Sequence, residues 1–446
     1  MTIGEEPTNL DKVQKLQAAL RAKAKESPSF RFYSLYDKLY RKDVLWVAFW
    51  QCRTNDGAPG VDGQTFAEII EYGVEKWLDE LAEELRTKQY QPQAVRRVYI
   101  PKPDGKQRPL GIPTIKDRVV QTAALLVLEP IFEADLQPEQ YAYRPERSAL
   151  SAVQEVHRLA CYGYQQVVDA DLNGYFDSIP HAELMQCLAR RISDKALLHL
   201  LKMWLVAPVE ETDERGHKQR TTRNKDTKRG TPQGAPLSPL LANLYMRRFV
   251  LGWKTLGHER TFKAKIVNYA DDFVILCRGS AKEAMAAMRD MMARLKLTVN
   301  DAKTKLCHLP AESFDFLGYT IGRYWSWKQR RMVLSTRPSQ KAVKRFKAKI
   351  SETTGRNQTL RAEEEVVQRL NRMLKGWANY FCLGPVSEAY RSIDLHLRQQ
   401  FRKWLVAKHK GMGRGINQYP NEYLYQELGL IQLTTWRTNY LRGRTA

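Results

Sequence analysis

Two short acidic strings, far apart in the chain, contain the side chains best suited to chemistry. Asp271 and Asp272 lie in the middle of an apolar stretch. Asp169 and Asp171 end another apolar run. Charge is costly in apolar surroundings, and a divalent cation is the simplest compensation for crowded carboxylates. An Asp-Asp pair alone is more often an ordinary turn, but the second acidic string favours a shared cation site.

Both acidic strings are predicted to lie at the ends of β-strands. Strands are expected over residues 166–172, 265–269 and 273–277, as members of a single antiparallel sheet. The two-residue period of a strand places Asp169 and Asp171 on one face. If the first strand lies beside the hairpin, the carboxylates form a hard oxygen site suited to Mg²⁺. Two such ions about 4 Å apart can activate a primer 3′-hydroxyl and stabilise a leaving pyrophosphate, which predicts nucleotidyl transfer.

Helices and further strands surround these strings. Apolar residues recur at helical spacing, and Gly and Pro clusters separate the segments. The expected helices span residues 9–55, 66–85, 118–132 and 281–295. Alternation predicts strands at 95–100 and 108–112, joined by a turn near which Lys102, Lys106 and Arg108 gather. Residues 209–230 are polar, which predicts an exposed hairpin or loop whose role the sequence does not reveal.

From about residue 320 the sequence is read as basic and helical, which predicts a domain boundary between residues 320 and 335. Three helices are expected from apolar stripes that include Val343 and Ile350, Val366 to Phe381, and Ile393 to Trp404. The exposed cations of the first two helices are candidates for contact with phosphate. We predict that the nucleic-acid-binding residues include Lys341, Lys344, Arg345, Lys347 and Lys375.

The charge balance indicates a polyanionic partner. The chain has 72 Lys and Arg against 49 Asp and Glu, a net charge of +23. Residues 321–446 alone hold 25 Lys and Arg and 8 Asp and Glu, a net +17, which leaves +6 for the other 320 residues. Such a basic end suits a phosphate backbone, because Lys and Arg release its counterions. The alternatives are a solvated basic surface or membrane affinity, but no long apolar span accompanies the charge.

Other classes of protein are disfavoured by what the sequence lacks. The first residues carry Glu5 and Glu6 and no apolar stretch, so no secretory signal is expected. The best uncharged apolar run, Val119 to Leu128, is about half the roughly 20 residues that a bilayer requires. Six scattered cysteines lack the spacing of a zinc site and are expected to be reduced. We therefore expect a cytoplasmic protein with no membrane partner.

The motifs resemble those of reverse transcriptases encoded in bacterial group II introns. The matching strings occur in the family's order from about residue 55 to 385. They are Gly60–Gly63, Ile100–Pro113, Tyr143–Pro145 with Arg147-Ser148, Asp171–Asp177, Gly230–Gly234 with Ser238–Asn243, Tyr269–Asp272, Asn300 with Lys303-Thr304, and Phe314–Gly318. The resemblance implies an α+β fold of the right-hand polymerase type. Fingers and a palm with an antiparallel sheet would precede an α-helical thumb or maturase region.

Family resemblance also implies roles for individual residues. Asp171, Asp271 and Asp272 would be the catalytic residues and would hold two Mg²⁺ ions, with Asp169 on the rim. Four residues would contact the incoming deoxynucleotide: Lys102 and Arg108 on its triphosphate, Phe176 against the sugar, and Gln233 in the pocket wall. Each of these four has an ordinary structural alternative, such as core, turn or solvated hairpin.

Residues Arg369 to Phe381 are similar to the maturase block of intron-encoded proteins. This similarity implies an enzyme that binds its structured intron RNA, aids its splicing and copies it into DNA at a target site. Its partners would be the intron RNA, an RNA template with a DNA primer, target DNA and dNTPs. A domesticated relative acting in DNA repair or phage defence is an alternative, and so is an RNA-binding splicing cofactor with an idle polymerase site.

Some positions depart from the family pattern. Asn268 stands where Arg is common, Ala142 and Glu146 replace glycines, and Ala235 follows Gly234 where another Gly is frequent. After Gln426 there is no cysteine and no His-Asn-His arrangement, so we expect the nuclease domain of many relatives to be absent. The expected organisation is an N-terminal extension and helical start of the fingers (1–95), fingers and palm (96–320), thumb or maturase domain (321–400) and a basic nucleic-acid-binding tail (401–446).

Overall fold

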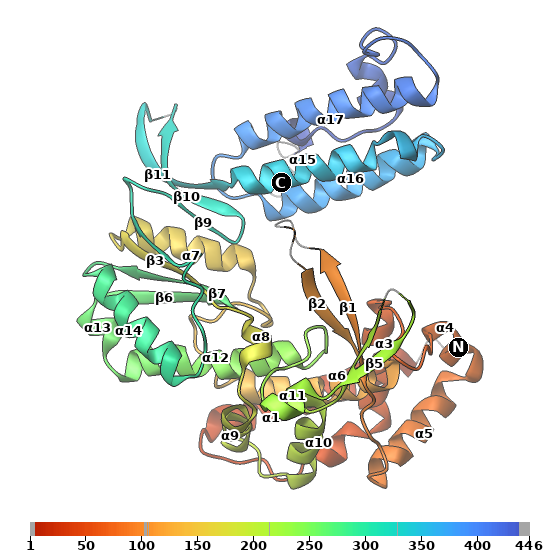
Figure 1. Cartoon of the computed structure of the whole chain (residues 1–446), viewed down its shortest axis with the longest axis vertical. Helices are drawn as coiled ribbons and strands as arrows, with labels where there is room; N and C mark the ends of the chain where they lie inside the picture. The colour runs from red at the N-terminus through yellow and green to blue at the C-terminus, as the bar shows by residue number, and fades with distance from the viewer. Residues whose placement is uncertain (1–4, 102–104, 106, 214, 328, 437–446) are drawn as a thin grey trace. The chain divides into compact units, whose positions relative to one another are not determined.

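Figure 1 shows a computed structural model of the chain, which describes residues 5–101, 105, 107–213, 215–327 and 329–436. The chain forms two compact units, which are described separately. The first unit comprises Met1–Ser148, Ala170–Ile275 and Lys282–Lys305, and the second comprises Ala149–Asp169, Leu276–Ala281 and Leu306–Ala446. Helices and sheets occur in both, so the predicted α+β class is confirmed.

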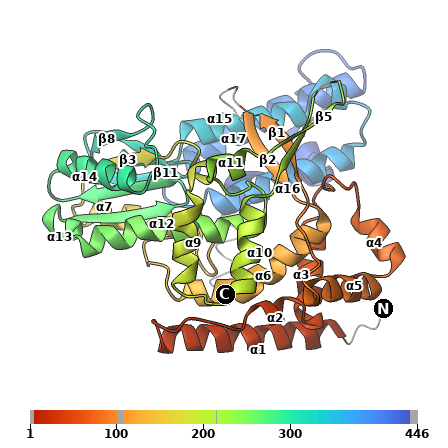
Figure 2. The ribbon, with the colours of Figure 1, turned by 60° about the horizontal axis from the view of Figure 1, so that its bottom comes forward.

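Most of the helices that the structure describes belong to the first unit. They are α1 (Glu5–Glu26), α2 (Tyr36–Leu39), α3 (Lys42–Thr54), α4 (Phe66–Tyr72), α5 (Val74–Arg86), α6 (Ile115–Glu133), α8 (Tyr175–Ser178), α9 (His181–Ala189), α10 (Lys195–Leu205), α11 (Arg223–Thr227), α12 (Ser238–Thr255), α13 (His258–Thr261) and most of α14 (Ala281–Arg294). Helix α6 is buried along nearly its whole length, and α1 and α3 pack against it and against each other (Figure 2). This explains its apolar composition.

The expected single helical run over residues 9–55 is wrong in one respect. The chain leaves the helix after Glu26, because Pro28 cannot continue it and restricts the residue before it. Arg191 fixes this break by donating hydrogen bonds to the carbonyl oxygens of Ala24 (2.7 Å) and Ser27 (3.0 Å). The predicted helix 66–85 is likewise divided, at Gly73, whose φ of 106° lies in the region that favours glycine.

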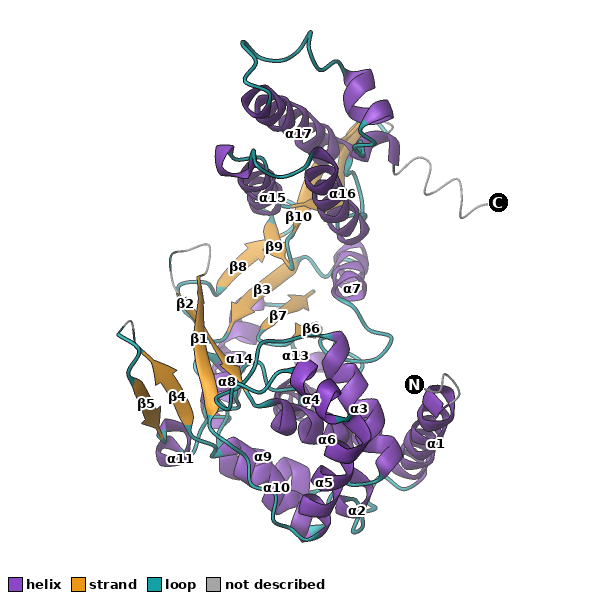
Figure 3. Ribbon diagram, turned by 90° about the vertical axis from the view of Figure 1, so that its right-hand side faces the viewer, coloured by secondary structure: helices purple, strands orange, loops and turns teal. Residues whose placement is uncertain are grey.

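One four-stranded sheet of the first unit has the order β2-β1-β4-β5 (Figure 3). Its strands are β1 (Val95–Pro101), β2 (Gln107–Ile112), β4 (Val209–Thr212) and β5 (Lys218–Thr221). Strands β1 and β2 form the predicted hairpin, and β1 pairs in parallel with β4 from Val95↔Val209. The polar stretch 209–230 is therefore a hairpin followed by α11. Arg220 of β5 forms an ion pair with Glu210 of β4 (2.8 Å).

The second four-stranded sheet has the order β6-β7-β3-β8. Its strands are β3 (Gln166–Asp171), β6 (Ala264–Tyr269), β7 (Asp272–Cys277) and β8 (Lys305–His308). Within the first unit, Phe249 of α12 packs on Phe273 of β7 with ring centroids 5.3 Å apart. Tyr245 of α12 donates a hydrogen bond to the carbonyl oxygen of Leu295 (2.7 Å). These contacts place the ends of β6 and β7 over a rigid helical support.

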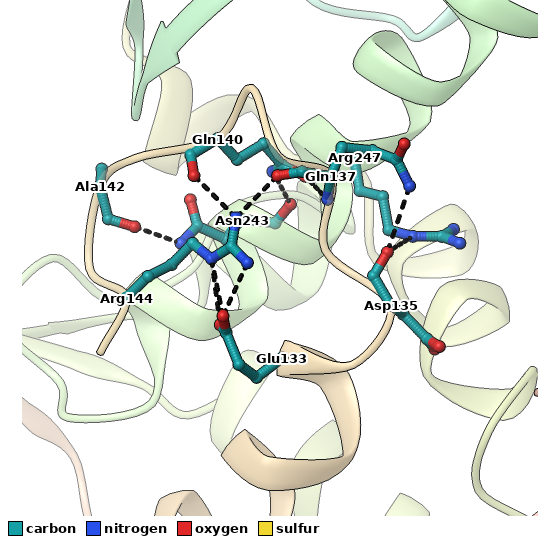
Figure 4. A network of polar contacts seen from close by, with 8 residues as sticks. All are labelled: Glu133, Asp135, Gln137, Gln140, Ala142, Arg144, Asn243 and Arg247. Atoms are coloured by element: carbon teal, nitrogen blue, oxygen red, sulfur yellow. Dashed lines mark hydrogen bonds and ion pairs between the residues drawn. The ribbon is translucent and has the colours of Figure 1, made fainter. Parts of the chain in front are cut away.

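A buried polar network fixes the loop that follows α6 (Figure 4). Arg144 pairs with Glu133 (2.6 Å) and also donates to the carbonyl oxygens of Gln137 and Gln140, both at 2.7 Å. Asn243 of α12 donates to the carbonyl oxygen of Ala142 (2.6 Å). The loop is therefore attached at both of its sides, and its conformation is determined by α6 and α12 together.

The second unit contains a three-stranded sheet and long helices. Its elements are α7 (Ala149–Cys161), β9 (Phe314–Phe316), β10 (Tyr319–Ser326), β11 (Arg331–Pro338), α15 (Gln340–Thr353), the 3₁₀ turn Arg356–Gln358, α16 (Glu363–Tyr380), α17 (Ser387–Lys408) and a π-helical turn, Tyr423–Glu427. The sheet order is β11-β10-β9. The residues of the predicted apolar stripes are buried in this unit. They are Val343, Phe346 and Ile350 of α15, Val366, Leu370, Leu374 and Trp377 of α16 with the following Phe381, and Ile393, Leu397, Phe401 and Trp404 of α17.

Two features of this unit differ from the expectations. The stretch from residue 319 to 338, read as basic and helical, is a β-hairpin in eight-residue register from Tyr319↔Pro338 to Ser326↔Arg331. The expected boundary at residue 400 falls inside α17. Beyond that helix the chain returns to the bundle. The backbone N–H groups of Leu433 (2.9 Å) and Thr434 (3.1 Å) donate hydrogen bonds to Asp394 of α17.

No helix in the described ranges combines the length and hydropathy needed to cross a lipid bilayer. None of the six cysteines, all of which lie in the described ranges, forms a disulfide.

The Arg144 network predicts a large loss of stability when it is broken. The Arg144 and Glu133 side chains are only 6% and 13% exposed, so Arg144→Ala leaves a buried carboxylate unpaired. We expect the free energy of unfolding of the first unit to fall by about 3–5 kcal/mol. Denaturant unfolding monitored by tryptophan fluorescence measures it. The matched control, Arg86→Ala, removes the solvent-exposed pair with Glu83 and should leave the transition midpoint unchanged; equal midpoints for both variants would contradict the assignment.

Candidate functional site

The turn between β6 and β7 carries Asp271 and is stabilised by the buried side-chain amide of Asn268. Ala270 has φ 58°, a left-handed conformation that is unfavourable for a residue with a Cβ atom. The buried Asn268 side chain donates a hydrogen bond to the carbonyl oxygen of Ala270 (2.8 Å). The backbone of Asn268 bonds to Glu139 (2.8 Å) and Tyr141 (2.9 Å). Asn268, noted in the sequence only as a departure from the family pattern, therefore stabilises the strained turn.

Asp171 ends β3 and is fixed by the segment that follows α14. The backbone N–H of Asn300 donates to the Asp171 carbonyl oxygen (2.8 Å), and the Asn300 side-chain amide donates to Asp171 Oδ2 (2.9 Å). Lys303 Nζ donates to the same Oδ2 atom at 3.0 Å. The position and the charge of Asp171 are thus controlled by two residues for which the sequence analysis suggested no role.

The three predicted catalytic carboxylates lie on adjacent strands, because β3, which ends at Asp171, is hydrogen-bonded to β7, which begins at Asp272 directly after Asp271. The pKa of Asp271 is raised, first by burial and also by the negative charge of Asp171. The pKa of Lys303 is also raised, first by its hydrogen bond to Asp171 and also by the charges of Asp171, Asp271 and Asp272. A single ammonium group therefore interacts with all three carboxylates. The structure brings these residues together within the first unit.

The donor set fits a hard divalent cation, although the side chains are not arranged around one. Carboxylate oxygens are the ligands that Mg²⁺ prefers. In the part of the chain that the structure describes, no three Asp, Glu, His or Cys side chains form a ready metal site. The Lys303 ammonium supplies compensating charge instead, 3.0 Å from Asp171, and its side chain is 62% exposed. The site thus has the chemistry for cation binding, with a lysine as the present counter-charge.

Two aromatic rings lie beside the carboxylates. Phe176 follows β3 in α8, and its ring centroid is 6.5 Å from that of Tyr143, in edge-to-face geometry. Tyr143 belongs to the loop fixed by Arg144, and its pKa is raised first by burial and then by the charge of Asp271. Tyr143 is therefore a neighbour of the carboxylates. Its presence in a matched motif was the only sign of this in the sequence.

Arg108 and Gln233 reach the same region from different elements. Gly111 of β2 donates its backbone N–H to the Gln233 carbonyl oxygen (2.6 Å). A Cβ atom on Gly234 would lie 2.5 Å from the Gly111 carbonyl oxygen, so only glycine permits this contact. The Gln233 side chain donates to Asp177 (3.1 Å), and the positive charge of Arg108 partly offsets the rise that burial causes in the pKa of Asp271. Lys102, the other predicted triphosphate ligand, lies outside the described residues.

The predicted nucleic-acid-binding cations belong to the second unit. Lys344 and Arg345 of α15 and Lys375 of α16 are exposed. Lys341 is also exposed and lies 3.5 Å from Asp315, whereas Lys347 is half-buried and donates to Ser392 (2.7 Å). Arg345 and Lys341 line a cavity of about 390 Å³ together with Phe346, Trp377 and Phe381. Cationic and aromatic side chains are therefore mixed on this part of the second unit.

Family comparisons agree with the geometry. Residues 100–321 match the family described as reverse transcriptase (RNA-dependent DNA polymerase), and residues 343–419 match the group II intron, maturase-specific domain. Protein YkfC of Escherichia coli (strain K12) is 33% identical over 371 residues, which cover 74% of this chain and 93% of that protein. Group II intron-encoded protein LtrA of Lactococcus lactis subsp. cremoris is 28% identical over 466 residues, 85% of this chain and 75% of that protein.

More distant similarities are also present. Nuclear intron maturase 2, mitochondrial, of Arabidopsis thaliana is 33% identical over 115 residues, 26% of this chain and 16% of that protein. Among solved structures, a partial Cas6-RT-Cas1–Cas2 complex has a TM-score of 0.35 at 24% identity, covering 58% of this chain and 41% of that chain. Telomerase from Candida albicans has a TM-score of 0.41 at 13% identity, covering 79% and 67%. Both TM-scores lie below 0.5, so these two likenesses carry no argument.

Proposed function

Because the chain belongs to the group II intron-encoded reverse transcriptases and maturases, we propose that Asp171, Asp271 and Asp272 hold two Mg²⁺ ions for RNA-directed DNA synthesis. The observation that carries this proposal is the strand order: β3, which ends at Asp171, is the hydrogen-bonded neighbour of β7, which begins at Asp272 directly after Asp271. The Lys303 ammonium, 3.0 Å from Asp171, also feels the charges of Asp271 and Asp272. When bound, Mg²⁺ would supply Lewis-acid stabilisation of the phosphoryl group and activation of the primer 3′-hydroxyl.

The residues around the carboxylates would orient the substrates. Arg108 extends a positive charge toward Asp271 and would bind the triphosphate of a deoxynucleotide, with Lys102 as a second cation. Gln233, held against β2, would form part of the pocket wall. The Phe176 ring, buttressed by Tyr143, would occupy the space that a ribose 2′-hydroxyl needs. Asn300 would keep Asp171 in one orientation while Lys303 withdraws from it.

The maturase-specific region would bind the parent intron RNA. Its helices α15 and α16 present exposed cations on a well-packed aromatic core, and A-form RNA is recognised largely through its shape and backbone. Rigid helices would hold those charges at a fixed spacing. The proposed activity is therefore twofold: assistance of intron splicing by RNA binding, and copying of the intron into DNA for mobility.

Removal of one carboxylate should abolish polymerisation. Metal coordination contributes several kcal/mol of transition-state stabilisation, so Asp271→Ala should reduce primer extension on an RNA template with Mg²⁺ by about 10³-fold or more. Gel-resolved extension with dNTPs measures the loss. The matched control is Asp301→Ala, because Asp301 is 77% exposed and pairs with Arg289 in the same region of the first unit.

The control variant should extend primers at the native rate. Equal extension by Asp271→Ala and the native chain would reject the assigned site and would favour an RNA-binding cofactor with an idle polymerase site.

Phe176 should control sugar selection. Phe176→Ala opens space beside the sugar, and we expect discrimination against ribonucleotides to fall roughly 10- to 100-fold, as measured by kcat/KM for rNTP relative to dNTP. Phe176→Tyr retains the ring and should retain most of the discrimination. Unchanged selectivity in the alanine variant would assign Phe176 to packing alone.

Reversal of the exposed charges on α15 and α16 should weaken RNA binding. The triple change Lys344→Glu, Arg345→Glu and Lys375→Glu should raise Kd for intron RNA and reduce the slope of log Kd against log salt by about one unit per lost phosphate contact. Filter binding at several salt concentrations measures both. Lys76→Glu is the control, since Lys76 lies among Glu75, Asp79, Glu80 and Glu83 on α5. A slope equal to that of the native chain would show that these cations do not contact phosphate.

A further inference from the structure

The β10–β11 hairpin is buried at its base and exposed at its far end. Tyr319 and Ile321 are fully buried, and Thr336 makes a 3.0 Å hydrogen bond with His157 of α7. A Cβ atom on Gly384 would collide with the Thr336 carbonyl oxygen, so the chain after α16 closes tightly against the same base. From Arg323 onward, the side chains emerge into solvent. In Figure 1 the far ends of β10 and β11 extend away from α15, α16 and α17.

One face of the distal half carries an aromatic and cationic surface. Arg323, Trp325 and Trp327 alternate along the chain and are all exposed. Cross-strand register places Met332 opposite Trp325, and Met332 is exposed as well. Trp325 and Trp327 are 41% and 81% exposed, with ring centroids 6.1 Å apart. Of the tryptophans that the structure describes, only these two are exposed.

The charge of the hairpin has one sign. Residues 319–338 contain five Lys and Arg and no Asp or Glu. Arg330 and Arg331 stand at the tip and are exposed, and Arg337 covers the ring of Tyr324 on the other face (5.5 Å). A hairpin anchored at its base, with exposed indoles and exposed arginines at its end, is complementary to a partner with planar apolar faces and negative charge.

Unpaired nucleotides have both of these properties. Every base offers a π-face for stacking on an aromatic side chain, and each nucleotide adds a phosphate. In a duplex the bases are stacked on one another and are not available to an indole ring. We propose that the distal half of the β10–β11 hairpin binds single-stranded nucleic acid, with Trp325 and Trp327 stacking on bases and Arg323, Arg330 and Arg331 contacting phosphates. This inference rests on the proposed function, in which RNA and DNA are the partners, and assigns to them a contact away from the carboxylate site.

The test measures how far binding depends on bases. The full chain and the double variant Trp325→Ala/Trp327→Ala are titrated with three fluorescein-labelled probes of equal length: a single-stranded oligonucleotide, its abasic analogue and its duplex. The native chain should prefer the single strand over the abasic analogue by about tenfold for each stacked base. The double variant should lose this preference and keep the salt dependence, because its arginines remain.

Two controls separate stacking from loss of folding. Trp325→Phe/Trp327→Phe retains aromatic faces and should retain most of the preference. Tyr33→Ala removes an exposed aromatic residue of the first unit, 74% exposed, and should bind like the native chain. Retention of the native preference by the double alanine variant would overturn the proposal. So would tryptophan fluorescence that responds to anionic lipid vesicles and not to the oligonucleotide.

The result is independent of catalysis. Base preference is measured without dNTPs, so the measurement does not require an active carboxylate site. If the native chain fails to extend a primer, the proposed polymerase function fails while the preference for bases is still measured. If extension proceeds and the double alanine variant shows no loss of base preference, only the hairpin proposal fails.

Discussion

Repulsion between carboxylates is the constraint on which the first unit depends. Two like charges about 4 Å apart repel by about 4 kcal/mol at an effective dielectric constant of 20, so they remain together only if the backbone gives them no alternative. Asn268 holds the turn below Asp271, and Asn300 holds Asp171 through both its backbone and its side chain. Lys303 offsets the remaining charge. The hydrogen-bonded framework thus holds the carboxylates in place and brings a cation to them.

The rest of the first unit positions what surrounds those carboxylates. The Arg144 network attaches the loop that carries Tyr143 to both α6 and α12, and Tyr143 in turn contacts Phe176. The close approach of Gly111 and Gly234 brings a strand of one sheet to a loop that precedes α12. Each contact joins segments far apart in the chain. The rings of Tyr143 and Phe176, the cation of Arg108 and the Asp271 carboxylate thus come from different elements of the unit.

In the second unit, apolar packing allows a strongly basic surface. Phe346 stacks on Trp377 with centroids 5.2 Å apart, and Trp377 also contacts Phe381 and Tyr390, so aromatic contacts join the helices. Lys344, Arg345 and Lys375 remain exposed on their surface. The β10–β11 hairpin follows the same principle, because its buried base supplies the stability and leaves its far end free to expose tryptophan and arginine.

The sequence by itself determined the local features: the strands before Asp171 and around Asp271, the buried helix α6, the apolar stripes of α15 to α17, and the carboxylate chemistry. Periodicity and residue type report on burial within a few residues, which suffices for such elements. Only the tertiary structure decided that Lys303, Asn300 and Tyr143 adjoin the carboxylates, that Arg191 secures the break after α1, and that residues 319–338 pair as a hairpin. The physical reason is that most of these contacts join residues distant in the chain, which local periodicity does not report. The hairpin is a separate case, because it is half-exposed and rich in Arg and so lacks the apolar alternation that identifies a buried strand.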